Sequence, residues 1–185
     1  MVMALLVMPQ PLLAGSMPFD NNGRLRCDSN GLIDRSDPKD LERKAAIELE
    51  PGTMATIPSV CPAERYFPSG VIVTPGATYQ ISAQGLWKDG WITVGAQGWW
   101  GFLLEAWNRL PWKPFFLLGG TLGQNDQQAF PIGLGRRWSA PNSLPSMADR
   151  QLYFFANDWP SKLQNNRTVS DTAGGPMRVT VLRIK

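Results

Sequence analysis

The sequence predicts an all-β fold of the sandwich class, and three observations carry this prediction. Glycine and proline are frequent, with 18 Gly and 16 Pro among 185 residues, which favours short strands and turns over long helices. After Pro51 the chain breaks into short β-branched runs, and in "ATYQISAQG" apolar and polar residues alternate with the period of a half-buried strand. The length suits one domain with a sizeable core. We therefore expect one sandwich domain over residues 51–185.

Two segments precede the expected domain. Residues 1–15 are uncharged and largely apolar and end in small residues, as a signal peptide does, although the basic residues typical of its start are missing. Residues 16–50 are polar and turn-rich, which predicts a solvated extension. We expect an exported protein, either secreted, periplasmic or at the cell surface, and no transmembrane segment.

The expected strands follow from short apolar runs and the turns between them. The turn "TPGAT" divides residues 71–84 into two strands that are tightly joined, and "FFLLGGTLG" predicts a buried strand that ends in a glycine turn. Residues 152–156 and 177–184 predict the final two strands. This succession of short strands is typical of a β-sandwich.

The segment 99–110 interrupts the strand pattern, because its apolar residues recur at helical spacing. Glu105 and Arg109 stand four residues apart, as a stabilising ion pair on a helix would. We expect a short helix or lid over one end of the sandwich. A helix that lies on a membrane interface is the alternative.

Charge and motifs argue against several function classes. The net charge of +3 comes without any block of Lys and Arg, so nucleic acid is not an expected partner. The chain has no His, the commonest general base, and no nucleophile elbow, phosphate loop or dinucleotide fingerprint. We therefore predict a protein that is not an enzyme, with a glycosidase-type carboxylate pair as the alternative.

The two cysteines, Cys27 and Cys61, are too few and too far apart for a structural metal site. We expect a single disulfide between them, and two free thiols are the alternative. A disulfide requires an oxidising compartment, which agrees with export.

Side-chain oxygens concentrate between the last two predicted strands, at Asn157, Asp158, Asn165 and Asn166. Calcium takes roughly 6–8 oxygen ligands, and Asn amides and backbone carbonyls serve it as well as carboxylates. The alternative is that Asn and Asp gather here because they favour turns.

This loop resembles the calcium loop of the bacterial calcium-dependent galactophilic lectins. The resemblance lies in Asn157-Asp158-x-Pro160 followed after four residues by Asn165-Asn166, and in the stretch "TPGATYQISAQGLWKDG", which is similar to the family's other calcium segment. It implies a jelly-roll β-sandwich with Ca²⁺ at one end, where two sugar hydroxyls complete the coordination of the ion.

The resemblance also implies roles for single residues. Asp158, Asn165 and Asn166 would be side-chain ligands of calcium, Lys162 would supply a backbone carbonyl, and Asp89 would take the position of a second backbone carbonyl. The carboxylate of Asp89 can add a further negative charge to a site that otherwise holds one.

Sugars pack their C–H faces on aromatic rings, so Trp159 in the loop and Trp87 near Asp89 are the expected sugar contacts. We expect the remaining tryptophans in the core or the lid: Trp91, Trp99, Trp100, Trp107, Trp112 and Trp138.

The chain departs from the family in lacking the His beside the sugar and in the bulkier "SKLQ" before the Asn pair. The predicted function is calcium-dependent carbohydrate binding, and the alternative is a calcium-stabilised structural or protein-interaction domain of the cell envelope. Neither the sugar nor the oligomeric state follows from the sequence.

Overall fold

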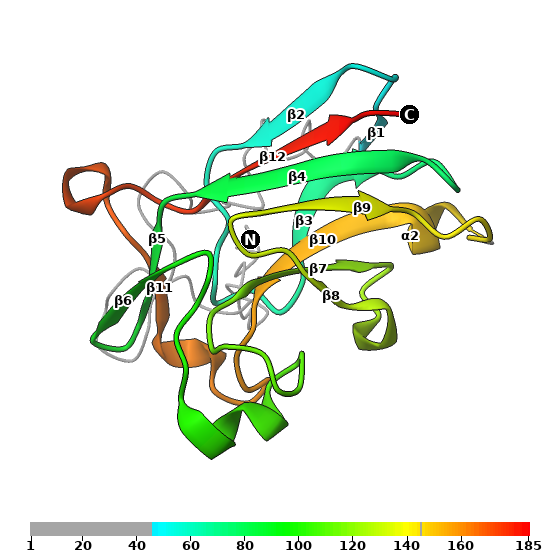
Figure 1. The fold of residues 1–185 in the computed structure, drawn as a ribbon. Coiled ribbons are helices and arrows are strands. Elements are labelled where there is room, and N and C mark those ends of the chain that lie inside the picture. Colours follow the sequence, from blue (N-terminus) through cyan, green and yellow to red (C-terminus); the bar gives the residue numbers. More distant parts are fainter. Residues whose placement is uncertain (1–45, 145) are drawn as a thin grey trace, which may run out of the picture.

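The computed structural model describes residues 46–144 and 146–185, which form an all-β sandwich (Figure 1). This confirms the predicted fold class. Within the described residues, one sheet has the order β1-β3-β10-β7-β8 and the facing sheet the order β2-β12-β4-β9. Their strands are β1 (Ile47–Glu48), β2 (Met54–Ile57), β3 (Phe67–Ile72), β4 (Thr78–Gln84), β7 (Leu118–Leu122), β8 (Phe130–Pro131), β9 (Gly135–Ser139), β10 (Gln151–Ala156) and β12 (Arg178–Arg183).

A smaller sheet stands at one end of the sandwich, with the strand order β11-β5-β6 (Figure 1). It comprises β5 (Leu86–Asp89), β6 (Ile92–Gly95) and β11 (Asn166–Thr168). The helical elements of the described chain are short: the 3-10 turns η1 (Phe102–Trp107), η2 (Asp126–Gln128), η3 (Leu163–Asn165) and η4 (Asp171–Ala173), and the α-helix α2 (Met147–Arg150). No described helix is long and apolar enough to cross a membrane.

The core lies between the two large sheets and follows from the alternation read in the sequence. In β4, Tyr79 and Ile81 are fully buried, whereas Thr78, Gln80 and Ser82 are not. β7 is buried along its whole length, as predicted, because both of its faces are covered. On the outer side Phe155 of β10 packs with Leu110 and Leu117, which belong to the loops beyond η1.

The turn predicted between residues 71 and 84 is present, but it joins two different sheets. The amide of Ala77 donates to the carbonyl of Thr74 (3.1 Å), and Gly76 has a φ of +73°, which glycine adopts without strain. Since β3 and β4 belong to opposite sheets, the turn carries the chain across the core.

The sandwich also begins upstream of residue 51. β1 pairs in parallel with β3, and Leu49 is buried in the core. The predicted signal peptide (1–15) and most of the predicted extension (16–50) lie outside the described residues.

The predicted disulfide involves Cys27, which also lies outside the described residues. Cys61 is buried in the core, and no described cysteine is free. The pairing of Cys27 with Cys61 stays a prediction.

The lid predicted near 99–110 contains the 3-10 turn η1 in place of an α-helix. η1 lies between Gly101 and Pro111, which leave little length for a regular helix. Among the described ion pairs Arg109 joins Asp126, so the predicted pair between Glu105 and Arg109 is wrong. Glu105 is instead buried, and its carboxylate accepts a hydrogen bond from the amide of Gly101.

The tryptophans divide differently from the expectation. Trp99 and Trp138 pack against the core, but Trp100, Trp107 and Trp112 expose most of their surface. These three residues lie in the segment 99–115, which extends the predicted lid by five residues and is called the lid from here on. Trp91 was expected in the core or lid, yet it stands at the turn between β5 and β6 and is 89% exposed. A two-residue hairpin turn offers no neighbouring layer against which a large ring could be buried.

Candidate functional site

The oxygen-rich loop folds back onto the small sheet at one end of the sandwich (Figure 1). The loop leaves β10 at Ala156 and returns as β11, which pairs with β5 so that Asn166 lies opposite Asp89. The amide of Gly90 also donates to the carbonyl of Asn165 (3.2 Å). Strand pairing therefore brings together two segments that lie far apart in the sequence.

Four of the predicted ligand side chains meet in this arrangement. The amide nitrogen of Asn166 donates to Oδ2 of Asp158 (3.0 Å), and that of Asn165 donates to Oδ1 of Asp89 (2.7 Å). Asp158 and Asn166 are 4% and 0% exposed, whereas Asp89 is half-buried and Asn165 exposed. The cluster thus has an inner half inside the protein and an outer half that faces solvent.

The two carboxylates of the cluster are electrostatically unfavourable without a cation. Burial, and to a smaller extent the charge of Asp89, raise the pKa of Asp158 to about 6 against the opposing hydrogen bonds from Asn166 and from the amide of Trp159. Burial likewise raises the pKa of Asp89. A bound cation would remove this penalty, because it favours the ionised form of both groups.

The inner half also contains an unmatched acceptor. Oδ1 of Asn166 is buried and has no hydrogen-bond partner among the described residues, while its amide nitrogen also donates to the carbonyl of Pro62 (3.1 Å). Buried polar atoms are normally paired, so we expect this oxygen to have a partner that is not a donor of the protein. Rotation of the amide by half a turn would direct its oxygen toward Asp158 and Pro62, an arrangement that a cation would stabilise. The donor set therefore fits a calcium ion.

The other members of the loop have separate roles. Lys162 closes a turn by donating its amide to the carbonyl of Trp159 (2.9 Å), and it precedes η3 in the same loop. Asn157 is fully buried and does not belong to the oxygen cluster. Its side chain binds the lid, accepting from the amide of Leu110 (2.7 Å) and donating to the carbonyl of Pro114 (2.8 Å).

The two predicted sugar contacts have different surroundings. Trp159 is half-buried beside Asp158, and its backbone amide donates to that carboxylate (2.7 Å). Trp87 is 0% exposed, its indole N–H donates to the carbonyl of Val60 (2.9 Å), and its ring packs edge-on against Phe116. A ring without exposed surface cannot contact a sugar, so the prediction for Trp87 is wrong.

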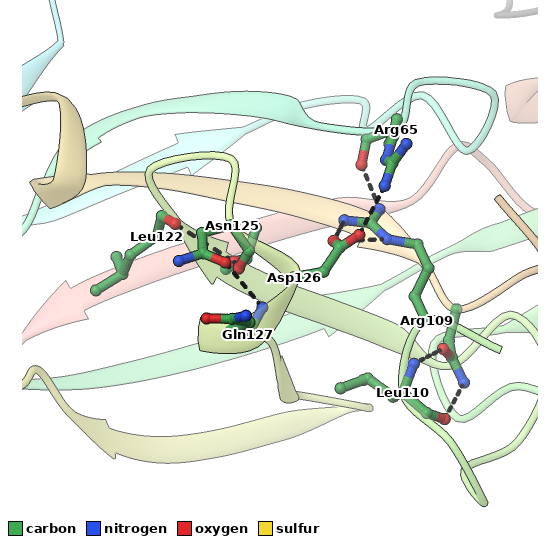
Figure 2. Close-up of polar contacts among 9 residues, drawn as sticks. Arg65, Arg109, Leu110, Leu122, Asn125, Asp126 and Gln127 are labelled. Carbon is green, nitrogen blue, oxygen red and sulfur yellow. Dashed lines mark hydrogen bonds and ion pairs between the residues drawn. The ribbon is translucent and has the colours of Figure 1, made fainter.

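A charged cluster joins Arg109 of the lid to Asp126 and Arg65 (Figure 2). The guanidinium of Arg109 has no exposed surface, binds Asp126 through Nε (3.1 Å) and Nη2, and also donates to the carbonyl of Arg65. It lies 3.7 Å from the ring centroid of Phe155. Arg65 binds the other oxygen of Asp126 (2.9 Å), and together the two arginines lower the pKa of Asp126 against the opposing effect of burial. Asp126 itself opens η2, where Asn125 accepts from the amide of Gln127 (2.9 Å).

Sequence reasoning missed three parts of this region: the carbonyl of Pro62, the lid anchor Asn157 and the ion pair of Arg109. None of the three is marked by a spacing in the sequence, because each depends on a contact between segments that lie far apart in the chain.

Similarity to known proteins is found among solved structures. No family model matches the chain, and no curated protein sequence matches it. Among solved structures, the N-terminal domain of EclA, described as a PllA-like lectin, is similar at 22% sequence identity. The similarity covers 70% of this chain and 94% of that domain, with a TM-score of 0.46.

Proposed function

We propose that this protein is an exported, calcium-dependent carbohydrate-binding module without enzymatic activity. The observation that carries the proposal is the oxygen cluster at the end of the sandwich: the amide of Asn165 bonds Asp89, the amide of Asn166 bonds Asp158, and Oδ1 of Asn166 is buried without a partner among the described residues. Such a donor set is suited to calcium.

Calcium would be held by the side chains of Asp158, Asn165 and Asn166 and by Asp89. The sequence resemblance adds the carbonyl of Lys162, and the hydrogen bond to Asn166 adds the carbonyl of Pro62 as a further candidate. When bound, the ion would supply coordination positions that can be filled by paired hydroxyl groups.

The outer half of the cluster is the side from which a sugar would approach. Asn165 is exposed and Asp89 half-buried, so coordination positions on this side face solvent. Trp159 is half-buried immediately beside Asp158 and would pack its ring against the C–H face of the sugar. A carbohydrate or glycoconjugate is the proposed partner.

The alternative, a calcium-stabilised structural or protein-interaction domain of the cell envelope, is favoured by the inner half of the cluster. Asp158 and Asn166 are buried and bonded to each other, as in a site closed by protein atoms. The two functions differ in whether positions on the ion remain open to solvent.

The first experiment tests for calcium. Thermal unfolding is followed with chelator and with millimolar calcium for the wild type, for Asp158→Asn and for Glu50→Gln, a control that removes an exposed carboxylate outside the cluster. Calcium at a hundredfold excess over Kd should stabilise the wild type and the control by about 2.7 kcal/mol, and Asp158→Asn much less. An unchanged wild-type melting temperature would remove the metal site from the proposal.

The second experiment separates the two functions. A glycan array is probed with and without chelator, and Trp159→Ala is compared with the wild type in both glycan binding and calcium binding. Carbohydrate binding predicts signals that chelator abolishes and that Trp159→Ala weakens while the calcium affinity stays unchanged. Calcium binding without any glycan signal would favour the structural alternative.

A further inference from the structure

We infer that the lid (residues 99–115) adds a second sugar subsite centred on Trp107, so that the site accepts an oligosaccharide in preference to a single sugar. This inference rests on the proposed carbohydrate-binding function. The lid 3-10 turn and the oxygen-rich loop lie at the same end of the sandwich (Figure 1).

A row of aromatic rings leads from the oxygen cluster to the lid surface. Trp99 stacks on Phe115 (5.2 Å between ring centroids), Phe115 meets Trp159 (6.0 Å), and Trp159 meets Trp107 (6.2 Å). The row passes the oxygen cluster at Trp159, which is half-buried and directly follows Asp158. It ends at Trp107, which is 64% exposed.

The last two rings of the row form a corner. The planes of Trp107 and Trp159 meet at 78°, so their faces point in different directions. One sugar ring is too rigid to pack against both faces at once. Two neighbouring sugar units, linked through a bent glycosidic bond, can place one ring on each face.

The exposed ring of Trp107 is held by a rigid lid. Asn157 bonds the lid at Leu110 and Pro114, and the side-chain amide of Asn108, next to Trp107, donates to the carbonyl of Lys113 (3.1 Å). Because Asn157 precedes Asp158 directly, the loop that carries the oxygen cluster also positions the lid. A ring that is fixed before binding costs little conformational entropy when a ligand packs on it.

The charge of the lid favours a neutral polar ligand over a lipid surface. The lid sequence contains three charged residues, and two of them, Glu105 and Arg109, are buried. Lys113 remains as the exposed cation, whereas segments that bind membrane interfaces usually carry several. Isolated indole faces beside polar groups are suited to the alternating C–H and hydroxyl surfaces of sugars.

The test compares short and long ligands. Binding is measured by calorimetry in millimolar calcium, using the methyl glycosides of galactose, fucose, mannose and glucose and the di- and trisaccharides that extend each of them. The wild type is compared with Trp107→Ala and with Trp112→Ala, a lid tryptophan of equal exposure without a ring contact to Trp159 among the described contacts.

The wild type should bind its preferred oligosaccharide about tenfold more tightly than the corresponding methyl glycoside, and Trp107→Ala should abolish this difference while it leaves the methyl glycoside affinity unchanged. Trp112→Ala should behave as the wild type. Calcium-dependent thermal stabilisation of Trp107→Ala shows that the variant is folded.

Two results overturn the inference and leave the proposed function intact: equal oligosaccharide affinity of Trp107→Ala and wild type, or an equal loss for both ligand lengths. Binding of the wild type, but not of Trp107→Ala, to phosphatidylcholine vesicles without any gain from longer sugars would assign the lid to membranes instead. If no glycan binds the wild type at all, both the inference and the proposed function fail.

Discussion

The buried carboxyl of Asp158 should make the calcium-free protein less stable as the pH rises. Burial, together with the charge of Asp89, raises the pKa of this group from 3.8 to about 6. The folded protein therefore holds the proton more tightly than the unfolded chain does. The stability that this proton provides is present below about pH 4 and is lost as the pH rises through about 6.

The size of the effect follows from the shift in pKa. The difference between 3.8 and about 6 is roughly two pKa units, and one unit corresponds to about 1.4 kcal/mol, so about 2–3 kcal/mol is lost between pH 4 and pH 7. Asp158→Asn keeps the shape of the side chain but cannot ionise. Other acids also titrate in this range, so the informative quantity is the difference in unfolding free energy between the variant and the wild type.

The assay is urea unfolding in the presence of chelator at several values of pH between 4 and 8. Relative to the wild type, Asp158→Asn should gain about 2–3 kcal/mol across this range. Saturating calcium at pH 7 should reverse the order, because the metal requires the ionised carboxylate. If the unfolding free energies of the two proteins run parallel from pH 4 to pH 7, Asp158 does not have the buried, cation-deficient surroundings described above.

Three further predictions concern the framework of the site. Arg109→Met should destabilise the protein by about 3 kcal/mol in urea unfolding, because it leaves the partly buried Asp126 with a single partner. Arg65→Met removes an exposed arginine from the same aspartate and should cost less than about 1 kcal/mol. Equal costs would contradict the assignment of Arg109 as the anchor of the lid. Trp87→Phe should lower stability by about 1–3 kcal/mol and leave glycan binding unchanged, and a selective loss of binding would restore Trp87 as a sugar contact. Mass measurement of non-reduced protein from its native compartment should show the oxidised mass, and two alkylated thiols at Cys27 and Cys61 would exclude the disulfide.

The sandwich could be predicted because its evidence is local. Alternation around Tyr79 and Ile81, the Pro-Gly turn at Gly76 and the apolar run of β7 each depend on residues that are close in the sequence. Each pattern reflects either a local backbone preference or the alternation of buried and exposed residues along a strand, and both are present in the folded chain. The sheet to which each strand belongs was not predictable in this way, since β3 and β4 are adjacent in the sequence but lie in opposite sheets.

The site was predictable in its composition more than in its geometry. Asp158, Asn165 and Asn166 fall within one short loop, and any fold must keep them near each other. Asp89 reaches them through the pairing of β11 with β5, and Pro62 through a hydrogen bond to Asn166. Both are long-range contacts, so no spacing in the sequence marks them.

The sequence by itself determined the strand periods, the turns and the oxygen-rich loop, because these follow from the preferences of neighbouring residues. Only the tertiary structure decided that Trp87 is buried, that Trp107 is exposed and that Arg109 binds Asp126 instead of Glu105. Tryptophan and arginine can be stable in either surrounding, as an indole packs in the core or on the surface and a guanidinium pairs with any carboxylate within reach. Their positions depend on which segments the two sheets bring together, and that information is distributed over the whole chain.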